Sequence, residues 1–211
     1  MKMVNGTFRQ RSVDASGSPG RRASAGPRRS KAASEAILVA AEAVLAEAGY
    51  AGFTIEQVAR RAGAGKPTIY RWWSGKPALL IEIYARQPLD LSGTDTGSLE
   101  SDLVAALGRL LAFWRDTPAG EAFTALLVEA QHDHAALEML RAFLAERSLP
   151  LADLFDRAAR RGELAADFDL AASLDLVSGY VWARLLTRRL DDDAGGLSSA
   201  ARLIARGCLR R

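Results

Sequence analysis

Apolar side chains recur at helical spacing along most of the chain, beginning near residue 30. The first predicted helix covers 30–48, and we expect Gly49 to end it because glycine commonly terminates helices. Strand-like alternation of apolar and polar residues is almost absent, and valine, isoleucine and threonine are scarce. The pattern therefore predicts an all-α fold.

A break at 87–98 divides this helical pattern into two unequal parts. Longer amphipathic helices are predicted after it, at 99–115, 119–131, 135–161, 169–189 and 197–209. Pro150 lies inside the third of these and should kink or split it, because proline has no N–H and clashes with the preceding turn. We expect four segments: a disordered basic arm at 1–29, a small helical domain at 30–86, a linker at 87–98 and a larger helical domain at 99–211.

Two short helices are predicted on either side of a glycine-containing turn at 63–65. Thr54 and Gln57 have the spacing of a capping box, which starts the first helix at Ile55. Pro67 fits the first turn of the second helix, where its missing N–H leaves no intrahelical bond unmade. Such a pair is a helix-turn-helix, the unit that places its second helix in the major groove of DNA.

The charge of this segment suits a polyanionic partner. Residues 57–81 contain five basic side chains and no Asp or Glu, whereas a DNA duplex carries one negative charge per ~1.7 Å. Ile69 and Trp73 lie four residues apart and should pack inward, which leaves Tyr70 and Arg71 outward. The net charge of +3 also conceals a basic N-terminal segment, since 1–31 holds eight basic residues and one acidic residue. A solvated basic face and a solvated tail are the alternative interpretations.

Composition excludes other classes of protein. No apolar run approaches the ~20 residues of a membrane-spanning helix, and the polar, arginine-rich N-terminus does not have the pattern of a secretory signal. Cys208 is the single cysteine, so neither an internal disulfide nor a cysteine-based zinc site is expected. These features favour a cytoplasmic protein with no membrane partner.

The stretch from Thr54 to Leu80, TIEQVARRAGAGKPTIYRWWSGKPALL, resembles the DNA-binding region of TetR-family transcriptional regulators. The resemblance extends over about 31–86, and the segment at 159–169 is similar, more weakly, to the C-terminal domain of one TetR subgroup. It implies that Thr54 and Lys76 contact DNA phosphates. It also implies that the following residues provide groove and backbone contacts: Gly65, Lys66, Pro67, Thr68, Tyr70, Arg71 and Trp72.

The larger helical part contains no catalytic signature. His132 and His134 are two residues apart and cannot share a helix face, and no nucleophile elbow, phosphate loop or dinucleotide fingerprint is present. We therefore expect no enzyme activity, no cofactor and no metal. The TetR resemblance implies that an unidentified small-molecule effector binds between these helices, although core packing also explains the aromatic residues. Candidate ligand contacts are Trp114, Phe123, His132, Phe143 and Arg184.

The last two predicted helices have apolar stripes, which a core-facing side also explains. The TetR resemblance implies that these two helices form a four-helix dimer interface with a second subunit. Gly179 and Ala183 are small residues four positions apart that permit close helix approach. The candidate interface residues are Val177, Val181, Leu185, Ala201 and Ile204.

These observations predict a homodimeric transcriptional regulator, a repressor that binds a palindromic double-stranded DNA operator and is released by a small-molecule ligand. The alternative is a helical small-molecule-binding or interaction protein without operator binding. The basic, acid-free stretch at 57–81 argues against that alternative.

Overall fold

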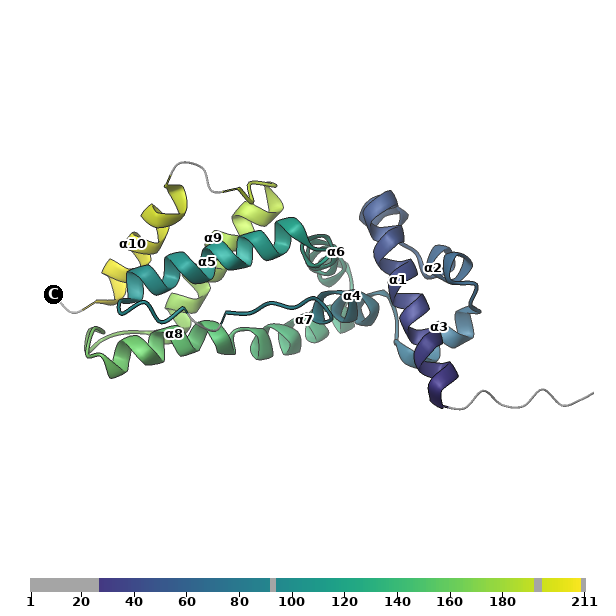
Figure 1. The fold of residues 1–211 in the computed structure, drawn as a ribbon, viewed down its shortest axis with the longest axis horizontal. Coiled ribbons are helices and arrows are strands. Elements are labelled where there is room, and N and C mark those ends of the chain that lie inside the picture. The colour runs from purple at the N-terminus through teal and green to yellow at the C-terminus, as the bar shows by residue number, and fades with distance from the viewer. Residues whose placement is uncertain (1–26, 92–93, 192–194, 210–211) are drawn as a thin grey trace, which may run out of the picture.

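The computed structural model describes residues 27–91, 94–191 and 195–209, and within these ranges every regular element is a helix (Figure 1). The all-α prediction is confirmed. The N-terminal helices are α1 (Pro27–Gly52), α2 (Ile55–Ala62), α3 (Lys66–Trp72) and α4 (Lys76–Ala85). The C-terminal helices are α5 (Leu99–Asp116), α6 (Ala119–His132), α7 (His134–Arg147), α8 (Leu149–Arg160), α9 (Leu170–Leu186) and α10 (Gly196–Cys208).

Both ends of α1 differ from the predicted helix at 30–48. The helix begins at Pro27, so the last residues of the predicted disordered arm belong to it, while 1–26 lie outside the described residues. Gly49 does not end α1 but interrupts it, with φ 61° and ψ −172°, and a further helical turn follows. Glycine suits this position because side chains with a Cβ rarely adopt a positive φ.

The start of α2 follows the predicted capping pattern. The Thr54 hydroxyl accepts a hydrogen bond from the backbone N–H of Gln57 at 3.1 Å. Phe53 and Val58, on either side of the cap, are both fully buried and form a hydrophobic staple. Gly63 ends the helix in the left-handed conformation at φ 60°. These contacts fix the direction in which the chain enters α3.

The C-terminal helices surround a continuous apolar core. α5 packs beside α10, α6, α8 and α9, and its residues Leu103 and Leu107 are fully buried (Figure 1). Helices α7 and α8 occupy the predicted 135–161 segment and are separated at Ser148, with Pro150 in the first turn of α8. The prediction that Pro150 would kink or split this helix is therefore confirmed.

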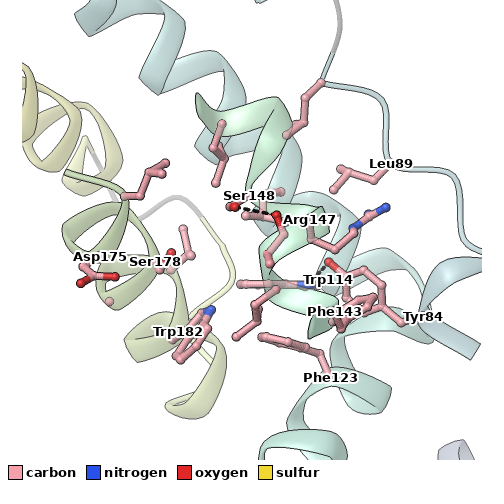
Figure 2. A pocket seen from close by; sticks show the side chains of 18 of the residues that line it. Tyr84, Leu89, Trp114, Phe123, Phe143, Arg147, Ser148, Asp175, Ser178 and Trp182 are labelled. Atoms are coloured by element: carbon pink, nitrogen blue, oxygen red, sulfur yellow. Dashed lines mark hydrogen bonds between the residues drawn. The ribbon is translucent and has the colours of Figure 1, made fainter. Parts of the chain in front are cut away.

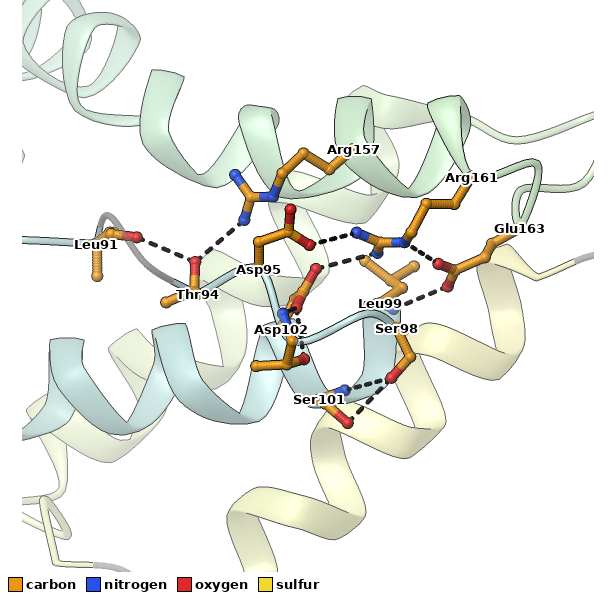
Figure 3. A network of polar contacts seen from close by, with 11 residues as sticks. Leu91, Thr94, Asp95, Ser98, Leu99, Ser101, Asp102, Arg157, Arg161 and Glu163 are labelled. Atoms are coloured by element: carbon orange, nitrogen blue, oxygen red, sulfur yellow. Dashed lines mark hydrogen bonds and ion pairs between the residues drawn. The ribbon is translucent and has the colours of Figure 1, made fainter.

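A polar network joins the segment before α5 to the loop after α8 (Figure 3). The carboxylate of Asp102 is completely buried and accepts hydrogen bonds from the backbone N–H and the hydroxyl of Thr96, both at 2.6 Å. Arg161 donates to Asp102 at 3.0 Å and also pairs with Glu163, whose second oxygen accepts from the Leu99 N–H at 2.8 Å. These bonds fasten the N-terminus of α5 to the body of the C-terminal helices.

Candidate nucleic-acid interface and internal cavity

Helix α3 presents one apolar face to the core and one mixed face to solvent. Ile69 is fully buried and Trp73, just past the helix end, is 6% exposed, as the sequence predicts. Tyr70 is 54% exposed on the opposite side. Of the other predicted DNA-contacting residues, Thr68 and Lys76 are half-buried and the following are exposed: Thr54, Gly65, Lys66, Pro67, Arg71 and Trp72.

Acidic residues from neighbouring segments reach this basic surface. Lys66 donates to Glu56 of α2 at 2.9 Å, and this hydrogen bond lowers the pKa of Glu56. Arg61 pairs with Glu47 of α1, so it is directed toward α1. Arg71 lies over the ring of Trp72 at 5.7 Å from its centroid. The acid-free run in the sequence therefore does not make an acid-free surface, because Glu56 directly precedes that run and Glu47 lies on the preceding helix.

Lys76 occupies a different environment from the α3 residues. Its ammonium group pairs with Glu129 of α6 and lies 4.6 Å from the ring centroid of Tyr50 in α1. The two paired side chains are only 29% and 15% exposed. Lys76 thus joins three helices at the junction between the N-terminal and C-terminal groups, and its predicted phosphate contact remains a prediction.

A cavity of about 580 Å³ lies between α4 and the C-terminal helices α5 to α9 (Figure 2). Its walls are mainly aromatic: Trp114 stacks on Phe123 at 5.5 Å, and Trp182 meets the same ring edge-on at 5.7 Å. Phe143 packs edge-on against Tyr84 at 5.1 Å. Three of the predicted ligand contacts, Trp114, Phe123 and Phe143, therefore line one cavity of a size typical for small-molecule sites.

The other two predicted ligand contacts, His132 and Arg184, do not line this cavity. His132 is exposed at the end of α6, and its Nδ1 lies 2.9 Å from the carbonyl oxygen of Val128. Arg184 is buried elsewhere on α9, where it donates to the Asp191 carbonyl oxygen at 2.5 Å and lies over the Tyr180 ring. The structure therefore does not bring these two residues together with the three aromatic candidates, and their predicted ligand contacts stay predictions.

The cavity also contains polar residues that sequence reasoning missed. Tyr84 comes from α4, and its hydroxyl accepts a hydrogen bond from Trp114 Nε1 at 3.3 Å. Burial raises the pKa of Tyr84. The Arg147 guanidinium lies 5.1 Å from the Tyr84 ring centroid, and Ser178 and Asp175 stand on α9. Tyr84 belongs to the N-terminal helices, so no local pattern placed it in a cavity of the C-terminal ones.

The apolar stripes predicted to meet a second subunit are mostly turned inward. Within the single chain, Val177, Val181, Leu185 and Ala201 are at most 5% exposed, and Ile204 is half-buried. The buried four pack against the protein's own core, so in the single chain they offer almost no surface to a second subunit.

A second stripe on the same two helices faces solvent. Leu176 and Leu203 are 62% and 73% exposed, and Leu186 is similarly exposed at the end of α9. Gly179 is exposed at the edge of the aromatic cavity, and a Cβ added at this position would meet no neighbouring segment within 4 Å. Together with exposed Ala183, these residues form a solvent-facing surface of small and apolar side chains.

No group of three or more His, Cys, Asp or Glu side chains in the described part of the chain is arranged to hold a metal ion. No described helix combines the length and the apolar character needed to cross a membrane.

Two family models match the chain. The model described as bacterial regulatory proteins, tetR family, matches 37–83, and the model described as tetracyclin repressor-like, C-terminal domain, matches 94–204. The HTH-type transcriptional regulator YdeS of Bacillus subtilis is 34% identical over 154 residues, which are 72% of this chain and 77% of YdeS. The DNA-binding transcriptional repressor TetR of Mycobacteroides abscessus is 32% identical over 169 residues, which are 79% and 88% of the two chains.

The fold has counterparts among solved structures. The crystal structure of the TetR family transcription regulator SCO0332 aligns with a TM-score of 0.62 and 27% identity, and covers 83% of this chain and 97% of that one. NalD of Pseudomonas aeruginosa, the secondary repressor of the MexAB-OprM multidrug efflux pump, aligns with a TM-score of 0.62 and 24% identity over 86% and 98% of the chains. The second likeness concerns the fold alone.

Proposed function

Because the chain belongs to the TetR family of DNA-binding transcriptional regulators, we propose that it is a repressor that binds a palindromic operator as a homodimer. A small molecule in the aromatic cavity releases it from the operator. The observation that carries the proposal is the position of α4: Lys76 at its start lies beside the DNA-binding helices, and Tyr84 near its end lines the cavity. The proposed function is binding, with no catalytic step.

The exposed side of α3 supplies the groups that we propose to contact DNA. Arg71 and Tyr70 carry donors suited to base edges and phosphate oxygens. Thr54 contributes as well, because its hydroxyl accepts the cap hydrogen bond from Gln57 and still has its own proton to donate to a phosphate. Lys66 is paired with exposed Glu56, a contact that a phosphate can replace at low cost.

We assign the dimer interface to the solvent-facing stripe of α9 and α10 rather than to the buried one. Three large apolar side chains of this stripe are exposed to solvent in the single chain: Leu176, Leu186 and Leu203. The small residues Gly179 and Ala183 permit close helix approach. A two-fold dimer presents two α3 helices, which suits the two half-sites of a palindrome.

The link between cavity and DNA is proposed to run through α4. A ligand that displaces Tyr84 shifts α4 against α6, where Glu129 holds Lys76. A small molecule lowers operator affinity only if it binds more tightly to the arrangement that fits DNA poorly. The rings packed around Tyr84, which include Phe113, Phe123 and Phe143, make that residue sensitive to what occupies the cavity.

Selection from a random duplex library tests the DNA-binding part of the proposal. The purified protein is incubated with the library at about 150 mM salt, where non-specific binding is weak, and the bound duplexes are sequenced. We expect an enriched palindrome, lost in Arg71→Ala and retained in the control Arg141→Ala, since Arg141 lies away from α3 and pairs with Glu138. Binding without any enriched sequence would favour the alternative, a helical ligand-binding or interaction protein.

A further inference from the structure

Arg147 differs from its neighbour in the cavity wall, Arg141, in lacking an acidic partner. Arg141 pairs with Glu138 at 2.6 Å, whereas no described carboxylate lies within ion-pair distance of the Arg147 guanidinium. Arg147 is half-buried, and the Tyr84 ring is its close contact. The Tyr84 hydroxyl accepts a hydrogen bond from Trp114 and also interacts with the Arg147 side chain, which uses only part of the donors of the guanidinium. A guanidinium beside an apolar cavity thus retains donors for a negatively charged group.

The remainder of the cavity favours a flat apolar body. Trp114, Phe123 and Trp182 form a cluster of stacked and edge-on rings, an arrangement to which a further aromatic ring can add. Asp175 stands on α9, across the cavity from Arg147 (Figure 2). Its negative charge disfavours an anion at that end, so the two charged residues together set the direction in which an anionic molecule lies.

We propose that the effector is an aromatic organic anion whose carboxylate, sulfonate or similar group binds Arg147 and whose rings pack against the cluster around Phe123. The inference rests on the proposed role of the cavity as the effector site and adds the chemical class of the ligand. Binding of the anion draws the guanidinium from the face of Tyr84, the α4 residue in the cavity wall. The negative group therefore acts on the helix that begins at Lys76.

Two fluorescent probes with one aromatic skeleton test the charge preference. The anion 8-anilino-1-naphthalenesulfonate and the uncharged N-phenyl-1-naphthylamine differ only in the sulfonate, and both brighten in apolar sites. Because a hydrogen bond to a charged group contributes more than a neutral contact, the anion should bind the full chain at least ~10-fold more tightly. Arg147→Gln should weaken anion binding by ~10- to 100-fold and change binding of the neutral probe by less than ~3-fold.

Matched variants control for folding and for general surface charge. Arg141→Gln removes a positive charge from the same cavity rim and should keep the preference for the anion, because that arginine is already paired. Arg147→Lys keeps a cation and should keep part of the preference. A thermal melt of each variant verifies that it is folded before the probe is added.

The outcomes distinguish the anionic class of the ligand from the role of the cavity as the effector site. Equal affinity for the two probes, or an unchanged preference in Arg147→Gln, overturns the anionic class while the cavity remains a ligand site. If neither probe binds, both the anionic class and the effector role of the cavity fail. Operator binding is measured separately by the library selection, so its result does not depend on the probes.

Discussion

Removing either partner of the Lys76–Glu129 pair should affect stability and DNA binding in different ways. Lys76→Met leaves the Glu129 carboxylate, only 15% exposed, without its cation at the junction of α4 and α6. Exposed pairs contribute about 0–1 kcal/mol and breaking a fully buried one costs about 3–5, so this half-buried pair should contribute ~2 kcal/mol. For a chain of this size, the loss corresponds to a fall of roughly 4–8 °C in Tm.

DNA binding by these variants follows from a competition for one ammonium group. Glu129→Gln removes the charge but keeps the size of the side chain, and it frees Lys76 for a DNA phosphate. Operator affinity should then rise by about 5-fold, the equivalent of ~1 kcal/mol. Lys76→Met should lower affinity for operator and random DNA alike, and should reduce the slope of log affinity against log salt by ~0.9, the value for one phosphate.

The measurements are thermal melts and anisotropy titrations at several salt concentrations, from about 50 to 200 mM. The double variant provides the control, because Lys76→Met with Glu129→Gln has no unpaired charge and should recover part of the stability lost in Lys76→Met. If Glu129→Gln binds DNA like the parent and Lys76→Met keeps the full salt slope, Lys76 makes no phosphate contact and the pair serves only to join the helices.

Three further predictions concern α3, the polar network and the dimer. Trp73→Ala should lower the free energy of unfolding by ~3–5 kcal/mol, whereas Tyr70→Phe should melt like the parent and weaken operator binding by ~0.5–1.5 kcal/mol; the opposite pattern in melts and titrations would invert the assigned faces of α3. Burial raises the pKa of Asp102, but the hydrogen bonds from Thr96 and Arg161 together outweigh it and leave the pKa lowered. The ionised carboxylate therefore stabilises the fold above the unfolded-state pKa of ~3.9, and this contribution is lost as pH falls through the folded-state value. Asp102→Asn should therefore be less stable than the parent by ~1–3 kcal/mol at pH 7, and denaturant titrations should show this difference in unfolding free energy shrinking below pH ~4. A difference that does not change with pH would contradict the role of the charge. Leu203→Glu should sediment as a folded monomer while Val181→Glu unfolds, because only the first side chain faces solvent in the single chain, and a dimeric Leu203→Glu would place the interface elsewhere.

Local chemistry made the DNA-binding helices predictable from the sequence. The cap formed by Thr54 and the i, i+4 pair of Ile69 and Trp73 depend on residues close in sequence, and the structure contains both as expected. The split at Pro150 is local in the same sense, because it follows from the missing N–H of one residue.

The sequence did not indicate contacts between residues that lie far apart along the chain. Helix α9 has apolar residues on two sides, with Val177 and Val181 inward and Leu176 outward, and periodicity alone does not say which side meets the core. The partner of Lys76 lies on α6, two helices further along the chain, so nothing near Lys76 indicated the pair. His132 has a side chain suited to ligand binding, but it is exposed at the end of α6 and does not line the cavity.

The short length of α4 explains how one helix can connect two sites. Lys76 and Tyr84 are eight residues apart, or ~12 Å along the axis of one uninterrupted ten-residue helix, so we expect a displacement at one end of the helix to reach the other. Tyr84 is held by aromatic rings of α5, α6 and α7, while Lys76 is held by Glu129 of α6. If operator and effector both act on this helix, the coupling between the two sites must be reciprocal. The factor by which operator DNA weakens effector binding should therefore equal the factor by which the effector weakens operator binding. Glu129→Gln, which loosens the first end of α4, should reduce both factors equally.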